Sequence, residues 1–237
     1  MPPDEQMQQF WDERAKENAF YFVDSRLDYN DTDVERFWSD GRDDLDQLLG
    51  LVGAQIAPGD AVVDVGCGVG RLSRAAAATA GHVTGVDVSA EMVKQARELN
   101  AHLGNVEFVQ GDGRHLNGVP DASADACISH VVFQHIPDPQ ITLGYIREMG
   151  RVLRPGGWAA FQVSNDPSIH RPKSTGLMGA VRRLLGREPR GRSNQSWIGS
   201  AVDLGDLRAA AADGGLDVER IEGEGTQWCC VLLRRRD

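Results

Sequence analysis

The stretch that decides the fold runs from residue 62 to residue 70 and reads Val62-Val63-Asp64-Val65-Gly66-Cys67-Gly68-Val69-Gly70. Its apolar beginning predicts a short buried strand, and its three alternating glycines predict a tight turn, because glycine adopts positive φ freely. The alanine-rich segment 71–79 predicts a helix whose first amides point toward the turn. In an open parallel sheet, ligands bind at the carboxyl ends of strands. The stretch therefore predicts a site for a nucleotide-like ligand.

Outward from this stretch, short apolar segments alternate with helical ones. The pattern predicts strands at 61–65, 83–88, 106–110, 126–133, 158–163, 216–221 and 226–234. It predicts helices at 71–79, 90–99, 141–153 and 202–212. Alternation of this kind pairs strands in parallel and puts helices on both faces of the sheet. We therefore expect an α/β fold with a doubly wound sheet.

The first fifth of the chain differs in composition from the rest. Residues 4–22 carry aromatic side chains among charges and predict a helix, and residues 40–51 predict a second helix. We expect residues 1–52 to form an N-terminal helical cap segment and residues 53–237 to form the ligand-binding domain. Within that domain, residues 165–200 interrupt the alternation with Pro, Gly, Ser and Arg, which predicts a variable, lid-like insertion.

The net charge of the chain is −10, which argues against a nucleic-acid partner because like charges repel. The charge is unevenly spread. Residues 1–46 hold 14 acidic and 5 basic side chains, whereas residues 170–192 hold 7 basic and 1 acidic. The basic segment either faces an anionic ligand or forms a solvated helix face, and both interpretations stay open.

The sequence favours neither a membrane protein nor a metal-binding protein. No apolar run approaches the roughly 18 residues of a membrane helix, so we expect no stable membrane insertion. The polar, acidic N-terminus is unlike a secretory signal, which favours a cytoplasmic location. The cysteines form no CxxC pattern and no carboxylates are paired at metal spacing, so we expect no metal. The oligomeric state is left open.

An acidic residue follows each of the next two predicted strands. Asp87 closes the second strand, where a carboxylate accepts hydrogen bonds from both hydroxyls of a ribose. Asp112 follows the third strand and is placed to accept from an adenine amino group. A dinucleotide-binding turn needs glycine or alanine three residues after Gly68, where this chain has Arg71. The spacing favours an adenosine-bearing ligand other than a dinucleotide.

Taken together, residues 55–165 resemble the class I S-adenosylmethionine-dependent methyltransferases. The motifs that carry the resemblance are residues 64–70, Asp87 with Met92, Gly111-Asp112-Gly113, residues 125–135 and the turn Leu153-Arg154-Pro155-Gly156-Gly157. The resemblance implies a Rossmann-like, seven-stranded sheet, mostly parallel with the last strand antiparallel. It also implies that S-adenosylmethionine is the cofactor.

The resemblance further implies roles for individual residues. It assigns cofactor binding to Asp64, Gly66, Cys67, Gly68, Gly70, Asp87, Val88, Met92, Gly111, Asp112, Gly113, Ser129 and His130. In many small-molecule members, an N-terminal arginine or tyrosine contacts the methionine carboxylate. Arg14 or Tyr21 is expected in that role, with surface charge or aromatic core as the alternative.

Methyl transfer requires alignment and exclusion of water, and it needs a base only when the acceptor loses a proton. His135 is the candidate base, and a structural histidine bonded to backbone is the alternative. The segment after the fifth strand varies most in the family and builds the acceptor pocket. Candidate acceptor contacts there are His170, Arg171, Lys173 and Trp197.

We therefore expect transfer of a methyl group to an oxygen or nitrogen of a small-molecule acceptor. The basic segment favours an anionic or glycosylated acceptor. Two alternatives stay open at this point. One is an NAD(P)-dependent oxidoreductase, and the other is a catalytically silent module that binds S-adenosylmethionine.

Overall fold

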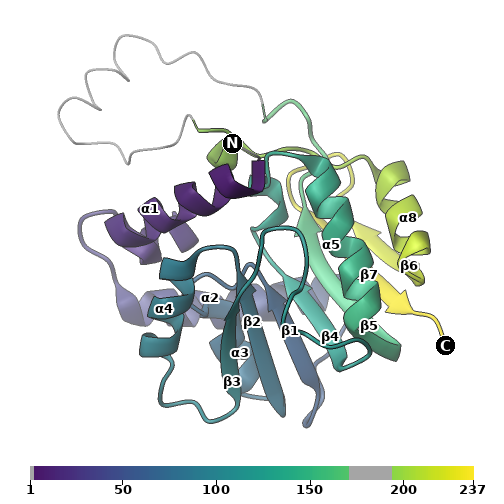
Figure 1. Cartoon of the computed structure of the whole chain (residues 1–237), viewed down its shortest axis with the longest axis horizontal. Helices are drawn as coiled ribbons and strands as arrows, with labels where there is room; N and C mark the ends of the chain where they lie inside the picture. The colour runs from purple at the N-terminus through teal and green to yellow at the C-terminus, as the bar shows by residue number, and fades with distance from the viewer. Residues whose placement is uncertain (1–2, 171–193) are drawn as a thin grey trace.

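The computed structural model describes residues 3–170 and 194–237 and contains one seven-stranded sheet flanked by helices (Figure 1). The strand order is β3-β2-β1-β4-β5-β7-β6. The strands are β1 Ala61–Val65, β2 His82–Asp87, β3 Val106–Gln110, β4 Ala124–Ser129, β5 Leu153–Val163, β6 Leu216–Glu222 and β7 Cys229–Arg235. β7 runs antiparallel to β5 and β6, and the other pairs are parallel. The predicted mostly parallel sheet with an antiparallel last strand is confirmed.

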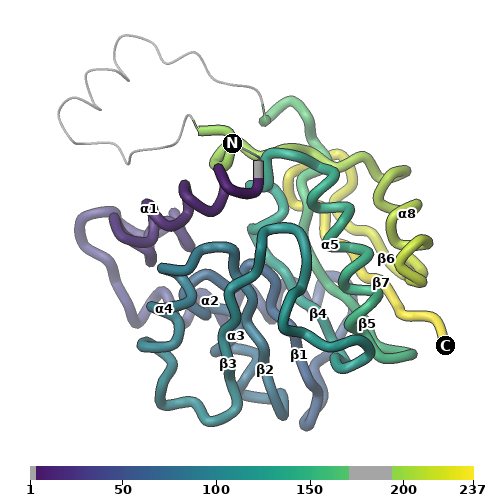
Figure 2. The backbone as a smooth tube through the Cα atoms, viewed as in Figure 1, coloured from purple at the N-terminus to yellow at the C-terminus, as the bar shows by residue number. Residues whose placement is uncertain are grey.

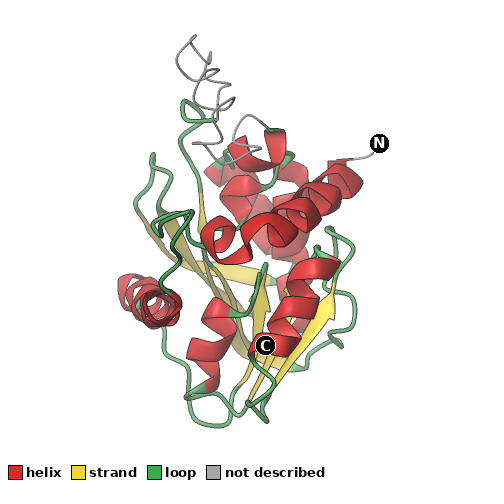
Figure 3. Cartoon of the chain, turned by 90° about the vertical axis from the view of Figure 1, so that its left-hand side faces the viewer, coloured by secondary structure: helices red, strands yellow, loops and turns green. Residues whose placement is uncertain are grey.

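Helices lie on both sides of this sheet (Figure 3). They are α1 Pro3–Val23, α2 Val34–Val52, α3 Arg71–Ala77, α4 Ala90–Leu99, α5 Pro139–Val152, α7 Gln195–Ile198 and α8 Leu204–Asp213. Ser89 caps α4 as its sequence predicts. Asp33 caps α2 by accepting the Arg36 N–H, so this helix begins at Val34, earlier than the leucine pattern alone predicts.

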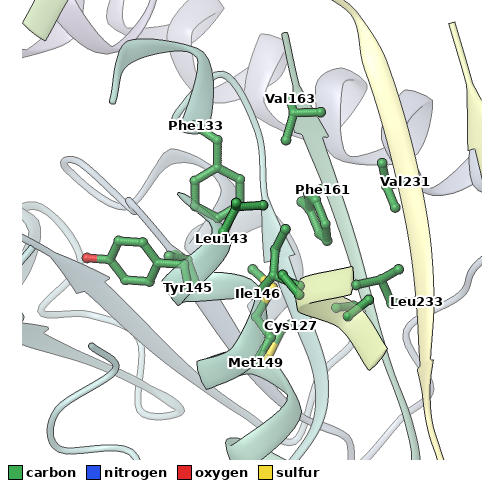
Figure 4. Close-up of a cluster of buried hydrophobic side chains, with 14 of the residues drawn as sticks. Cys127, Phe133, Leu143, Tyr145, Ile146, Met149, Phe161, Val163, Val231 and Leu233 are labelled. Atoms are coloured by element: carbon green, nitrogen blue, oxygen red, sulfur yellow. The ribbon is translucent and has the colours of Figure 1, made fainter. Parts of the chain in front are cut away.

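One face of the sheet packs against α5 and α8. Alternate residues of β4 and β5 point to this side and meet apolar side chains of both helices (Figure 4). Cys127 and Phe161 of the strands are fully buried in one cluster with Ile146 and Met149 of α5. The ring of Phe133 joins them, with its centroid 5.6 Å from that of Phe161. This cluster supports the segment that leaves β4.

The opposite face packs against α2 and α3. Leu48 of α2 and Leu72 of α3 are buried in one cluster with Ala160 of β5. Val62 and Val63 are neighbours in β1, and their side chains pack on opposite faces of the sheet because successive side chains of a strand alternate. β1 is therefore covered on both sides and gives a rigid base to the turn that follows it.

The fourth strand is shorter than predicted. β4 stops at Ser129, and the chain turns at Val131, which has a φ of +58°, before the 3₁₀ helix η1 Phe133–His135. A residue with positive φ cannot continue an extended strand, so the prediction of a strand as far as residue 133 is wrong. β5 begins at Leu153, so the glycine-containing turn predicted before it lies within the strand, where the register with β4 is irregular.

Helix α1 lies over the carboxyl ends of the strands next to it. Asp12 of α1 accepts hydrogen bonds from Ser89 Oγ at 2.6 Å and from Glu91 N at 3.1 Å, which tie α1 to the start of α4. α1 also contacts α7, which lies at the same end of the sheet (Figure 2). The boundary after residue 52 and the lid-like insertion stay predictions, and residues 171–193 of that insertion lie outside the described residues. None of the described helices is long and apolar enough to cross a bilayer.

Candidate active site

A cavity of about 500 Å³ opens at the carboxyl ends of β1, β2 and β4. It is lined by the glycine turn after β1, the end of β2, helices α1 and α2, the turn after β4, and Trp197 of α7. These segments are far apart in the sequence, and the sheet brings them to one place. The cavity lies where open parallel sheets bind their ligands.

Three glycines shape the turn after β1. Gly66, Gly68 and Gly70 have φ values of +76°, +53° and +89°, a region in which other residues are strained. A β-carbon on Gly66 would overlap the side chain of Val132, and one on Gly68 would lie 2.7 Å from Cγ2 of Val23. The turn therefore requires glycine both for conformation and for space.

Asp87 ends β2 directly beside this turn. Its Oδ2 accepts the Gly68 N–H at 2.9 Å, and its Oδ1 accepts the Ser89 N–H at 2.9 Å. Burial raises the pKa of Asp87 to about 6, although both backbone hydrogen bonds favour the ionised form. An ionised carboxylate offers about four acceptor positions, so about two remain for ligand hydroxyls. Asp87 lines the cavity and is placed to use them.

Asp64 supports the turn from within β1. Its Oδ2 accepts a hydrogen bond from Ser73 Oγ at 2.6 Å, which connects β1 to α3. Burial raises the pKa of Asp64 to about 6, and the negative charge of Asp87 adds to the rise. Other predicted cofactor-binding residues that line the cavity are Cys67, Val88, Met92 and His130.

Two arginines and two aspartates lie together along the cavity, and we term Asp24, Arg26, Asp44 and Arg71 the charge network. Arg71 Nη1 lies 2.6 Å from Asp44 Oδ2, and Arg26 Nη2 lies 2.7 Å from the same oxygen. Arg26 Nη2 also lies 2.6 Å from Asp24 Oδ2. Sequence reasoning missed this network. The available signal was an arginine directly after the glycines in a chain whose N-terminal segment is strongly acidic.

The charge network is neutral overall and mostly buried. Arg71 and Asp24 are each 4% exposed and Asp44 is 6% exposed. Burial alone would raise the pKa of both aspartates, and the two arginines hold it below its ordinary value. Among the described residues, Arg71 Nε and His130 Nδ1 are buried without a hydrogen-bond partner. Such orphaned atoms beside a cavity indicate a polar ligand.

His135 lies among aromatic rings that line the cavity. Its Nδ1 is 2.7 Å from the Trp197 carbonyl oxygen, so Nδ1 carries a hydrogen and donates it. Burial lowers the pKa of His135 to about 4, which makes the ring neutral at pH 7. The ring centroids of Trp11 and Trp197 lie 5.8 and 5.1 Å from that of His135. His135 Nε2 therefore carries no hydrogen, and the Gln134 amide nitrogen lies 3.3 Å from it.

Several residues predicted to bind the cofactor lie outside the lining of this cavity, namely Arg14, Tyr21, Gly70, Gly111, Asp112, Gly113 and Ser129. Arg14 Nη1 lies 2.6 Å from Glu17 Oε2. Asp112 accepts hydrogen bonds within its own loop, including the His115 N–H at 2.7 Å. Ser129 Oγ donates to the carbonyl oxygen of the strand residue Val65 at 2.8 Å. Cofactor contact by these residues stays a prediction.

The predicted acceptor contacts divide into two groups. Trp197 lines the cavity, and His170 Nδ1 donates to the Ile198 carbonyl oxygen at 2.5 Å. Arg171 and Lys173 lie outside the described residues. Within residues 3–170 and 194–237, no three histidine, cysteine or carboxylate side chains gather as metal ligands, and independence from metals stays a prediction.

Comparison with known proteins agrees with this geometry. Residues 63–161 match the family described as methyltransferase domain. Over 168 residues, the chain is 30% identical to a ubiquinone biosynthesis O-methyltransferase of Nitrosospira multiformis, covering 70% of this chain and 66% of that protein. It is 33% identical to a malonyl-[acyl-carrier protein] O-methyltransferase of Pectobacterium atrosepticum, covering 71% of this chain and 60% of that protein. The chain thus spans less than two thirds of the length of these curated relatives.

Solved structures share the fold at low sequence identity. A phosphoethanolamine N-methyltransferase of Haemonchus contortus matches 99% of this chain and 49% of its own with a TM-score of 0.68 at 18% identity. An S-adenosylmethionine-dependent methyltransferase of Mesorhizobium loti matches 80% of this chain and 96% of its own with a TM-score of 0.59 at 21% identity. With its glycine turn, its strand order and its matched segment, this chain belongs to the class I S-adenosylmethionine-dependent methyltransferases.

Proposed function

We propose that this chain transfers a methyl group from S-adenosylmethionine to an oxygen or nitrogen of a small-molecule acceptor, without a metal ion. The observation that carries the proposal is a single cavity that contains the glycine turn and Asp87 together with the neutral His135. The first two groups suit an adenosine-bearing donor, and the third suits an acceptor that loses a proton. Family membership argues against the nicotinamide oxidoreductase alternative.

The described residues fit the donor at both of its ends. Asp87 has acceptor positions left for ribose hydroxyls, and the glycine turn lets backbone approach the ligand closely. The charge network offers carboxylates and guanidinium groups to an amino acid that carries both charges, and Arg71 Nε has no other partner among the described residues. S-adenosylmethionine supplies a methyl group that is already activated by its sulfonium.

The acceptor in this proposal lies beside His135, Trp11 and Trp197. The two indole rings keep water away from the reacting atoms, and His135 Nε2 accepts the proton that the acceptor gives up. Both curated relatives described above are O-methyltransferases by name, which supports an oxygen as the accepting atom. The net charge of −10 supports a partner other than a nucleic acid.

The test of this function is to incubate the purified chain with methyl-labelled S-adenosylmethionine and an extract of its host. Labelled products are then identified by mass spectrometry, and S-adenosylhomocysteine is quantified in parallel. The expected result is a labelled small molecule formed in step with S-adenosylhomocysteine. Tight donor binding without any labelled product would instead favour the catalytically silent module.

The affinity for S-adenosylhomocysteine, the demethylated donor, is expected to rise with pH. Ribose hydroxyls donate to the ionised carboxylate of Asp87, whose pKa is about 6 in the free protein. At pH 5 about one tenth of this group is ionised, so Kd is expected to be about tenfold higher there than at pH 7.5. Calorimetry at the two pH values measures the change. Asp87→Asn should bind weakly and with a much smaller difference between the two pH values, and a constant Kd in the unsubstituted chain would contradict the assignment.

Removal of the candidate base is expected to slow turnover. In His135→Ala and His135→Gln, turnover should fall at least about tenfold, because neither new side chain offers a ring nitrogen that accepts the proton. Glutamine keeps an N–H for the Trp197 carbonyl, so it tests proton transfer without loss of that anchor. Substitution of the exposed His102 by alanine is the matched control. Unchanged turnover of both His135 variants with the natural acceptor would leave His135 as a structural histidine.

A further inference from the structure

We propose that Gln162 of β5 is a positioning residue that holds the turn after β4 and thereby directs His135 toward the acceptor. The proposal rests on the proposed function, in which His135 faces the acceptor. Gln162 is fully buried in a strand whose neighbouring residues are apolar. A buried amide destabilises the fold unless its hydrogen bonds are made, so the groups that bond to Gln162 indicate its structural role. The partners are three residues on two segments, the turn after β4 with η1 and the loop before β7.

The hydrogen bonds of Gln162 have a defined direction. The Val131 N–H donates to Gln162 Oε1 at 3.1 Å, which leaves the amide nitrogen of Gln162 to donate elsewhere. Gln162 Nε2 donates to Gln134 Oε1 at 3.0 Å and to the Gln227 carbonyl oxygen. Since Gln134 accepts through its oxygen, its own nitrogen faces His135 Nε2, at 3.3 Å. Backbone groups thus fix the Gln162 amide, and Gln162 in turn fixes the amide of Gln134. The bond from His135 Nδ1 to the Trp197 carbonyl leaves the lone pair of His135 on Nε2.

The turn that Gln162 holds is strained. Val131 has a φ of +58°, which a β-branched residue rarely adopts. A conformation of this kind persists only when the surrounding structure imposes it. Besides Gln162, the close approach of the next side chain, Val132, to Gly66 restrains the turn. Without the Gln162 amide, the turn is free to relax toward extended backbone, and η1 would move His135 away from the donor.

The first test is kinetic. In Gln162→Leu, kcat with the natural acceptor is expected to fall at least about tenfold, because a displacement near 1 Å at the reacting atoms has effects of this size. The Kd for S-adenosylhomocysteine should change less than about threefold, since neither Asp87 nor the charge network bonds to Gln162. Gln134→Leu removes the hydrogen bond from Gln162 and the contact with His135 but keeps the bond from the Val131 N–H to Gln162, and it should also lower kcat. A kcat within twofold of the unsubstituted chain in both variants would overturn the proposal.

The second test uses pH. The carboxyl group of Gln162→Glu accepts from Val131 as before, but it donates to Gln134 only while it is protonated. Burial favours its neutral form, so the variant should approach the kcat of the unsubstituted chain at low pH and lose it progressively as the carboxyl ionises. If Gln162 had only a structural role, Gln162→Glu would be less stable, but the ratio of its kcat to that of the unsubstituted chain would be the same at every pH. A constant ratio would therefore overturn the proposal.

Two controls separate this inference from general damage and from the proposed function. Val83→Ala removes a buried side chain near the amino end of β2, at the far end of the sheet from the cavity, so it should lower the melting temperature and leave kcat unchanged below the transition. The ¹⁵N spectrum of labelled His135 reports its ring nitrogens without any acceptor, and Gln162→Leu should shift the Nε2 signal. If no methyl transfer is found, an unchanged Nε2 signal in Gln162→Leu still overturns the positioning role.

Discussion

Asp87→Ala is expected to weaken the binding of S-adenosylhomocysteine about 100-fold. The carboxylate is placed for two ribose hydroxyls, and hydrogen bonds to a charged group contribute about 1.5–3 kcal/mol each. A factor of 100 corresponds to about 2.7 kcal/mol, which is a cautious value for the loss of both. The substitution also leaves the N–H groups of Gly68 and Ser89 without their acceptor, so part of the loss will come from the turn itself.

A thermodynamic cycle that combines Asp87→Ala with removal of a ribose hydroxyl separates the lost ligand hydrogen bonds from the disturbance of the turn. The 2′-deoxy analogue of S-adenosylhomocysteine should bind the unsubstituted chain about tenfold more weakly than the parent compound, because one hydrogen bond is lost. In Asp87→Ala the two compounds should bind equally. Asp121→Ala, which removes an exposed carboxylate far along the sequence, is the matched control for charge. If the deoxy analogue loses affinity equally in both proteins, Asp87 supports the turn and does not contact the ribose.

The sheet and its connections were predictable because their signals are local. Strands β1, β2 and β4 are largely buried on both faces, so each appears in the sequence as a short apolar run. Ser89 marks the start of α4 with a side-chain cap. The glycine turn was predictable for a related reason. Its positive φ values and its close neighbours exclude other residue types, so the alternating glycines in the sequence directly indicate this backbone conformation.

The end of β4 was not predictable from the same rules. Residues 130–133 are as apolar and β-branched as a strand, yet Val131 adopts positive φ. The contact that imposes this conformation comes from Gln162, which is 31 residues away in the sequence. A pattern read along one segment cannot include such a partner, so the prediction followed the local preference and extended the strand too far.

The charge network was missed for the same physical reason. Its members come from the loop after α1, from α2 and from the start of α3, and only the folded chain brings them together. In the sequence, Asp24 and Asp44 are two acidic residues among many, and Arg71 is one charge after a glycine turn. These residues form a network because they are buried close together, and no pattern of neighbouring residues in the sequence indicates that burial or those distances.

That burial leads to the second large expected effect, which concerns stability. Asp44→Ala is expected to lower the free energy of unfolding by about 3 kcal/mol, because it leaves the buried Arg71 without its nearest carboxylate. The value lies at the low end for a broken buried ion pair, since Asp24 remains 3.6 Å from Arg71 Nη1 and Arg26 is half exposed. For a domain of this size the melting temperature should fall by roughly 6–12 °C.

Asp43→Ala is the matched control, because it removes the same charge from the adjacent, exposed position of α2. It should change the free energy of unfolding by no more than about 0.5 kcal/mol, and both variants can be compared by thermal and denaturant unfolding. Equal stability of the two variants would mean that the network remains solvated and that Arg71 does not depend on Asp44. A loss confined to Asp44→Ala, reversed in part by saturating S-adenosylhomocysteine, would instead show that the donor and the ion pairs stabilise the same arrangement of α2 and the glycine turn.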